Sequence, residues 1–387
     1  MKQLLCITVL VTIVGSLLLA SAIPLGLAQA STEISGVISV NMTLTKQNSP
    51  YVFTGPVLVN NGVTLTIQPG SSLVLGAYYL QVNGTLQARG SPSDPIRFSG
   101  GSTSVTPITF TTFSSGWNEQ SATGCIIENA VLTATGVEVQ SSSPKINNCT
   151  FSGSGITVSD ATQGSAIVSN NTVKGVGASL SSGIMSSGNT VISNNNVSGW
   201  QTGVYVFFGN ATVGNNLVWN NSLEGIRVDY RIDYGASTSP TLSNNTVVNN
   251  TLGLNLVGSP TPTIIYNNIN NNTNYNVVLY NGTGPYPKGG NINATYNYWG
   301  TINTALINQT IWDFKKDFNL GNVTFVPFLN AINPAAPQFP SAIPFVPEFS
   351  GTMMTVFAVA AITLSVVAAG SSLLRERRKS LHSPLQH

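Results

Sequence analysis

The sequence predicts an all-β fold of the solenoid type, a parallel β-helix of about ten coils. A six-residue pattern, apolar-x-x-Asn-x-apolar, recurs seven times at intervals of 20 to 29 residues, and such a period is the signature of stacked repeats. Short apolar runs bounded by glycine or asparagine separate the copies, with no helical periodicity between them. Charged residues make up 7% of the chain and hydrophobic ones 42%, which argues against disorder.

The repeated pattern assigns residues to columns that run from coil to coil. The first apolar position gives an inner column: Ile126, Ile146, Val168, Ile192, Val213, Leu242 and Ile265. The fourth position gives a turn column of asparagines: Asn129, Asn171, Asn195, Asn216, Asn245 and Asn268. Coils in a parallel sheet lie about 4.8 Å apart, so stacked amides can exchange hydrogen bonds. We therefore interpret these asparagines as a structural ladder.

Regular alternation of apolar residues precedes the repeats, from residue 51 to residue 98. This run resembles the opening coils of right-handed parallel β-helix proteins of the pectate-lyase-like superfamily, and the Asn- and Gly-containing units resemble its repeats. Residues 296–300, 311–314 and 323–328 are similar to the closing coil of surface members. The resemblance covers residues 31–330 and implies a right-handed β-helix, a fold that hosts many activities. We expect end caps near residues 32–52 and 305–328, the second with a short helix.

The N-terminus has the layout of a secretion signal, residues 1–30. Lys2 precedes an uncharged apolar run, and Ala28-Gln29-Ala30 fits the small-x-small cleavage rule. The mature chain would begin at Ser31. An uncleaved anchor helix is the alternative.

The C-terminus predicts attachment to a membrane. A proline-rich linker, residues 331–350, leads to an uncharged run, residues 351–374, that is long enough to span a bilayer. The basic residues that follow place the tail, residues 375–387, in the cytoplasm. Pro347, Glu348 and Phe349 resemble the PEF-type sorting signal of archaeal surface proteins, which archaeosortase-like enzymes are thought to process. A cell-surface domain is thus expected, with the anchor either retained or exchanged.

The remaining composition excludes some classes and leaves others open. Net charge is +2, so no basic surface suggests nucleic acid. Both histidines lie beyond the predicted anchor, which argues against a copper site. Cys125 and Cys149 fall in different columns and are expected to be free thiols. Fourteen Asn-x-Ser/Thr sequons are plausible glycan acceptors if the chain is secreted.

One charge cluster stands out in the repeats, in the unit with the longest insertion. Stacking the preceding coil on it places Tyr205 beside Arg227 and Phe207 beside Asp229. Aromatic rings and fork-like polar groups together suit a sugar-binding strip. Its candidate residues are Tyr205, Phe207, Arg227, Asp229, Arg231 and Asp233. A solvated ion-pair patch is the plainer interpretation.

Two functions remain open. The first is a non-catalytic surface module that binds a polysaccharide, a glycoprotein or a neighbouring envelope protein. The alternative is a polysaccharide lyase or glycoside hydrolase, the lyase with calcium. Hydrolysis needs two carboxylates about 5–9.5 Å apart, and only Asp229 with Asp233 or Glu224 could supply them. With 13 acidic residues in the chain, we favour binding, with no catalytic residue, metal or cofactor assigned.

Overall fold

The computed structural model describes residues 31–102, 104–161, 165–176, 181–230, 238–281 and 290–339. One compact unit extends to Phe339 and a second begins at Pro340. The predicted signal (1–30), the Pro347-Glu348-Phe349 motif, the apolar run (351–374) and the tail (375–387) lie outside the described residues. Within the described part, no helix is both long and apolar enough to cross a membrane.

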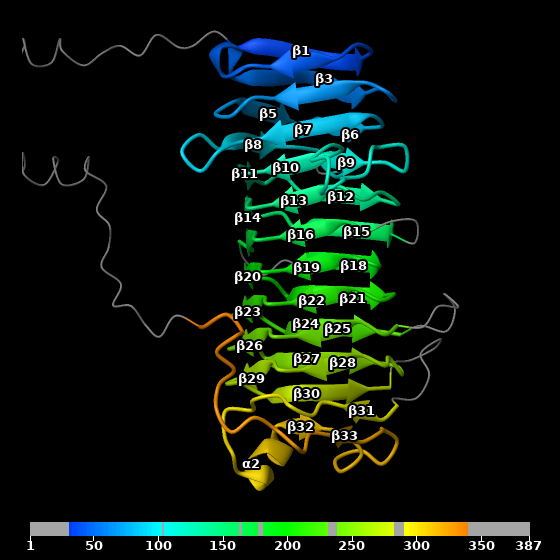
Figure 1. Ribbon diagram of the computed structural model, residues 1–387, viewed down its shortest axis with the longest axis vertical. Helices are drawn as coiled ribbons and strands as arrows, with labels where there is room; N and C mark the ends of the chain where they lie inside the picture. Colours follow the sequence, from blue (N-terminus) through cyan, green and yellow to red (C-terminus); the bar gives the residue numbers. More distant parts are fainter. Residues whose placement is uncertain are drawn as a thin grey trace, which may run out of the picture. The chain divides into compact units, whose positions relative to one another are not determined.

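The first unit is a parallel β-helix, in which every coil contributes short strands that pair with their equivalents in the next coil (Figure 1). Ten strands form the first row, in agreement with the predicted number of coils. These are β2 (Met42–Leu44), β4 (Thr64–Ile67), β7 (Thr85–Arg89), β10 (Ile126–Glu128), β13 (Lys145–Asn147), β16 (Ile167–Ser169), β19 (Val191–Ser193), β22 (Thr212–Gly214), β25 (Thr241–Ser243) and β28 (Thr263–Ile265).

A second row follows the first within each coil. It contains β5 (Ser72–Gly76), β8 (Ile96–Gly100), β11 (Ala130–Thr133), β14 (Thr150–Ser152), β17 (Thr172–Lys174), β20 (Asn196–Ser198), β23 (Leu217–Trp219), β26 (Thr246–Val248) and β29 (Asn268–Asn270). Asparagine is frequent in the turns before and after this row because the backbone there enters the left-handed region.

The third row completes each coil. It contains β6 (Leu80–Val82), β9 (Ile108–Phe110), β12 (Val137–Gln140), β15 (Ile156–Ala161), β18 (Ser182–Gly188), β21 (Thr202–Phe208), β24 (Glu224–Asp229), β27 (Leu252–Val257), β30 (Tyr275–Tyr280) and β32 (Ile311–Trp312). The long strands β1 (Thr32–Ile38) and β3 (Tyr51–Val59) join the second and third rows, since β3 pairs with both β5 and β6.

Inward-facing residues alternate with outward-facing ones and fill the coils with one continuous apolar core. The inner column of the first row runs through Ile127, Ile146 and Val168 and ends with Leu242 and Ile264. The predicted column was one residue out of register at both ends, at Ile126 and Ile265. At each place two isoleucines stand together, so the sequence pattern fits either one.

The asparagine ladder is present, but two of its predicted members are wrong. The Oδ1 of each ladder asparagine accepts a hydrogen bond from the backbone N–H of the residue one coil earlier. From Asn171 to Asn267, the side-chain amide of each also donates to the Oδ1 of the asparagine one coil later. The ladder consists of Asn171, Asn195, Asn216, Asn245, Asn267 and Asn297. Asn129 instead occupies the preceding position, with φ 49°. Asn268 begins β29 and bonds outside the ladder, to Thr246 and Asn333.

A second ladder, not predicted, lies in the turn between the second and third rows. Asn221, Asn250 and Asn272 repeat the same bonds, with Oδ1 of each accepting from the residue one coil earlier. Trp200 N–H is the first donor, to Asn221 Oδ1 at 3.1 Å. The sequence signal was the second set of Asn-Asn pairs, at 220–221, 249–250 and 271–272.

The two ends of the solenoid differ from each other. Residues 32–38 form β1, which pairs with β3 through a register shift between Ile34 and Gly36, so the predicted N-terminal cap is part of the first coils. The short 3-10 helix η1 (Lys46–Asn48) follows β2. At the other end α2 (Thr304–Gln309), N-capped by Asn303, covers the core with the fully buried Ile307. This agrees with the predicted helix in the C-terminal cap, where β31 (Ile292–Asn293) pairs with β33 (Val323–Thr324).

The chain beyond the last coil folds back on the outside of the second row. Asn333 N–H donates to Asn268 Oδ1 at 2.7 Å, and its amide donates to Asn244 Oδ1 at 3.0 Å. Phe339 packs edge-to-face on Trp219, with ring centroids 5.3 Å apart. Residues 333–339, expected to be extended linker, therefore belong to the packed unit.

Candidate functional site

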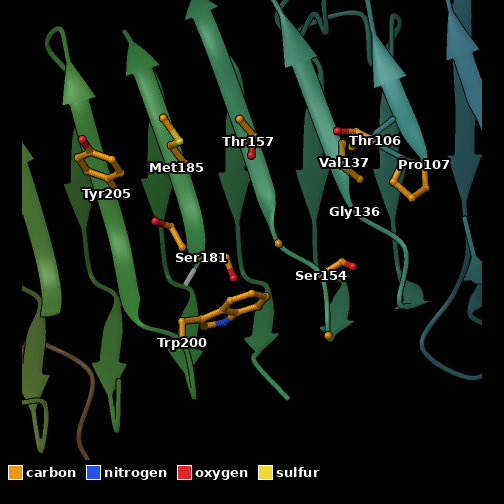
Figure 2. A pocket seen from close by; sticks show the side chains of 13 residues that line it. Thr106, Pro107, Gly136, Val137, Ser154, Thr157, Ser181, Met185, Trp200 and Tyr205 are labelled. Atoms are coloured by element: carbon orange, nitrogen blue, oxygen red, sulfur yellow. The ribbon is translucent and has the colours of Figure 1, made fainter. Parts of the chain in front are cut away.

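The outward side of the third row carries a column of residues in strict register. Thr157, Met185, Tyr205, Arg227 and Asn255 lie on five successive strands, β15 to β27. Tyr205, Met185 and Thr157 stand side by side in Figure 2. Tyr205 and Arg227 thus lie beside one another, as the stacking argument predicted.

A groove of about 520 Å³ lies at the start of these strands. Its lining comprises Thr106, Pro107, Gly136, Val137, Gly153, Ser154, Gly155, Thr157, Ser181, Ser182, Met185, Trp200 and Tyr205. The groove begins where the second asparagine ladder ends. Upstream of Trp200 the same turn carries Gly153, Ser154 and Gly155, and these small side chains leave the space open (Figure 2).

The groove is lined by hydroxyl, aromatic and other apolar side chains. Trp200 is anchored by a hydrogen bond from Nε1 to Val173 O at 3.1 Å and is 4% exposed. Tyr205 stands at the opposite side from Pro107 (Figure 2). Serine and threonine hydroxyls donate and accept between these apolar surfaces. None of the described residues that line the groove is charged.

Arg227 binds the tyrosine and a buried carboxylate at the downstream edge of the groove. Its Nε donates to Asp229 Oδ1 at 2.8 Å and its Nη2 to Oδ2 at 3.0 Å. The Tyr205 hydroxyl donates to the same Oδ2 at 2.8 Å, and the guanidinium lies 5.2 Å from the Tyr205 ring centre. The Asp229 carboxylate is fully buried, so this bidentate pair fixes the orientation of Tyr205.

Glu224 joins the same network from the other end of β24. Its Oε2 accepts from Thr202 Oγ1 at 2.6 Å, and its Oε1 accepts from Asn255 Nδ2 at 2.6 Å and from Arg227 Nη1 at 3.3 Å. Burial alone would lower the pKa of Arg227, but the bonds to Asp229 and the charge of Glu224 raise its pKa overall. Arg227 therefore remains a cation shared by two buried carboxylates.

The predicted strip is assembled in part. Phe207 lies beside Tyr205, with ring centroids 5.7 Å apart in an edge-to-face arrangement. Asp229 lies on the outward side of β24, but Tyr205 and Arg227 bond to its carboxylate and it is fully buried. Arg231 and Asp233 lie outside the described residues. Sequence reasoning did not find Trp200 or the groove, although the Gly-Ser-Gly turn in place of Asn-Asn was a visible signal.

The described residues contain no group of three or more His, Cys, Asp or Glu side chains placed to hold a metal ion. Cys125 and Cys149 are free and buried, as predicted. Burial raises the pKa of Cys125 to about 11 and that of Cys149 to about 12, so neither is an activated thiol.

Comparison with known proteins concerns the fold. Residues 135–297 match the family model described as a right handed beta helix region, and no curated protein matches the sequence. The similar solved structures are of the periplasmic alginate epimerase AlgG. Two mutant forms are 13% and 11% identical, each over 75% of this chain and 84% of that one, with TM-scores of 0.39 and 0.42. A third structure is 12% identical over 76% and 78%, with a TM-score of 0.30. The chain is a parallel β-helix by its own strand pairing, and residues 135–297 are similar to right-handed β-helix regions.

Proposed function

We propose that this chain is a cell-surface β-helix that binds an uncharged polysaccharide in the third-row groove without cleaving it. The observation that carries the proposal is the groove itself. Serine and threonine hydroxyls line it together with the Tyr205 ring, the largely buried Trp200 forms part of its wall, and no charged residue lines it among those described. Apolar sugar faces pack on aromatic rings while sugar hydroxyls bond to side-chain hydroxyls.

Binding is favoured over cleavage because the neighbouring carboxylates are committed to structure. Glu224 and Asp229 are 2% and 0% exposed and both bond to Arg227. A general acid or base must reach the substrate proton through a hydrogen bond, and these groups bond to the protein instead. A lyase or hydrolase remains the alternative that the assay below distinguishes.

A surface location is part of the proposal and is supported by the sequence of the chain ends. The apolar run at residues 351–374 with basic residues after it, and the leader at residues 1–30, are the supporting features. Retention of this anchor and its exchange by an archaeosortase-like enzyme predict different masses. Mass spectrometry of the mature protein distinguishes them, because exchange removes the residues after the Pro347-Glu348-Phe349 motif.

The test uses the full chain in a detergent without a sugar headgroup, on a panel of neutral and acidic polysaccharides with and without calcium. Retention and new chain ends are measured in the same samples. We expect retention of a neutral polymer and no new ends. Tyr205→Ala should abolish retention, since the ring supplies the contact. Tyr205→Phe should weaken retention without abolishing it, because the ring stays while its hydroxyl bond to Asp229 is lost. Phe113→Ala, which removes a side chain 63% exposed outside the groove, is the matched control.

Three results would contradict the proposal. Equal retention by Tyr205→Ala, with native circular dichroism, would place binding elsewhere. A preference for acidic polymers would contradict the uncharged ligand. New reducing or unsaturated ends that disappear in Asp229→Ala would make the chain an enzyme.

A further inference from the structure

A second hollow of about 520 Å³ lies farther along the third row, near the C-terminal cap. It is lined by Leu252, Asn274, Tyr275, Val278, Leu279, Tyr280, Asn281, Trp312, Asp317 and Leu320. Tyr275 and Trp312 meet edge-to-face, with ring centroids 5.3 Å apart.

The rings of this pocket are held in place by a cation. Lys316 Nζ lies 4.5 Å from the Tyr275 ring centre and 6.0 Å from that of Trp312. The same ammonium donates to Gln309 O, the last residue of α2, at 2.6 Å. The C-terminal cap therefore fixes the two rings before any ligand arrives, which lowers the entropic cost of binding.

The pocket also offers polar groups suited to hydroxyls. Asp317 uses Oδ1 to accept from the backbone and side-chain N–H groups of Asn319. Its Oδ2 accepts no hydrogen bond in the described part of the chain. Like the groove, the pocket combines apolar area with a few polar groups that fix the orientation of a ligand. It differs from the groove in one respect, because the carboxylate of Asp317 is part of its lining.

The pocket and the groove are connected by one column of the third row. Tyr205 pairs with Arg227, Arg227 with Asn255 and Asn255 with Val278, and Val278 pairs with Trp312. Four steps of about 4.8 Å separate Tyr205 from Trp312 by about 19 Å. On this path Asn255 Oδ1 is buried and has no hydrogen-bond partner among the residues that the structure describes.

We propose that the Tyr275–Trp312 pocket is a second subsite for the polysaccharide of the groove, so that the ligand is a linear polymer lying along the solenoid axis. This inference rests on the proposed function. Joining two weak subsites in one chain makes the second contact intramolecular and raises affinity well beyond that of either alone. Affinity should therefore depend on chain length, with a threshold at the length that reaches both sites.

The test measures affinity of the full chain for size-fractionated oligosaccharides of neutral β-glucan and mannan, in the detergent used above. Short oligomers should bind at the groove alone. Oligomers that span about 19 Å beyond it should bind at least about a hundredfold more tightly. Trp312→Leu and Tyr280→Ser should remove this gain while leaving the affinity for short oligomers unchanged. Tyr280 is 54% exposed, so its replacement tests the pocket without disturbing the core.

The outcomes separate the two proposals. No length threshold, with long-oligomer affinity unchanged in both pocket variants and lost in Tyr205→Ala, would overturn the second subsite and leave the groove intact. Loss of the gain in Tyr280→Ser but not in the control Phe113→Ala would support it. No binding of any oligomer by the unmodified chain would overturn both.

Discussion

Cys149 takes the place of an asparagine above Asn171 in the first ladder. Its backbone N–H donates to Asn171 Oδ1 at 2.9 Å. Its thiol lies 3.5 Å from Ile127 O and 3.2 Å from Asn147 O. Asn216 uses its amide on the equivalent pair, Ile192 O and Gly214 O. The thiol therefore occupies a position where the other coils have a side-chain amide, and it is a weaker hydrogen-bond donor than that amide.

Replacing Cys149 by asparagine should extend the ladder by one coil. The new amide would donate to the two carbonyls that the thiol now contacts, so the free energy of unfolding should rise by about 0.5–1.5 kcal/mol. Cys149→Val, similar in size but without a donor, should lower it by about 1–3 kcal/mol. Chemical denaturation followed by circular dichroism measures both. Equal stability of the two variants would show that the ladder position carries no hydrogen-bond requirement.

Neighbouring asparagines should differ in what they stabilise. Asn267→Ala removes the side-chain amide that donates to Leu242 O and Asn297 Oδ1. It also removes the Oδ1 to which the Asn245 amide donates. Several buried partners lose their bonds, so the cost should exceed about 3 kcal/mol. Asn268→Ala loses bonds to Asn333 and Thr246 and should mainly release residues 333–339. Hydrogen exchange of residues 333–339 should increase in Asn268→Ala at nearly unchanged global stability, and the reverse ranking would contradict the ladder assignment.

Arg227 should be required for stability because two buried carboxylates depend on it. Arg227→Met leaves Glu224 and Asp229 charged and uncompensated, at a cost of about 3–5 kcal/mol. Combining it with Glu224→Gln and Asp229→Asn should recover most of this loss. Arg227→Lys keeps the positive charge but loses the bidentate hydrogen bonds to Asp229, so its stability should lie between that of Arg227→Met and that of the wild type. Thermal unfolding compares the four proteins, and failure of the triple variant to recover would show that the charge itself is not the cause.

Stability should fall at alkaline pH because of the two buried thiols. An exposed thiol in the unfolded chain has a pKa of about 8.5, whereas the folded values are about 11 and about 12. Above pH 9 the unfolded chain binds fewer protons than the folded one, so the unfolding free energy decreases as pH rises. Between the unfolded and folded pKa values, each thiol lowers the unfolding free energy by about 1.4 kcal/mol per pH unit. Below the unfolded pKa, the stabilisation from each protonated thiol is fully present.

The comparison of interest is the wild-type chain against Cys125→Ser with Cys149→Asn, since other groups titrate equally in both. Denaturation midpoints between pH 8 and pH 11 should diverge as the wild type loses stability faster. Parallel slopes would mean that the thiolates are tolerated in the folded chain.

The repeat pattern was sufficient to predict the fold, and its errors were errors of register. The apolar and asparagine positions recur once per coil because every coil must bury the same face and make the same turns. The doubled isoleucines at 126–127 and 264–265 fit the pattern in two ways, and so do the doubled asparagines at 267–268. Pairing of whole strands decided between them, since Ile127 and Ile264 continue the inner column and Ile126 and Ile265 do not.

The candidate site was only partly accessible to sequence reasoning. Tyr205 and Arg227 were placed together because equivalent positions of adjacent coils must stack. The groove was missed because it arises from an absence: the second ladder stops at Trp200, and small residues leave its place empty. The burial of Asp229 was also missed, because alternation along β24 places a residue outside the coil without telling what covers it.

The sequence by itself determined the β-helix, its number of coils, its turns and the free cysteines, since these follow from a period that each unit obeys locally. Contacts between coils decided which asparagines form ladders, that residues 333–339 return along the second row, and that Tyr205 and Trp312 lie in one column of the third row. These depend on contacts between coils and between distant segments, where the exact register and the size of each neighbouring side chain set the outcome.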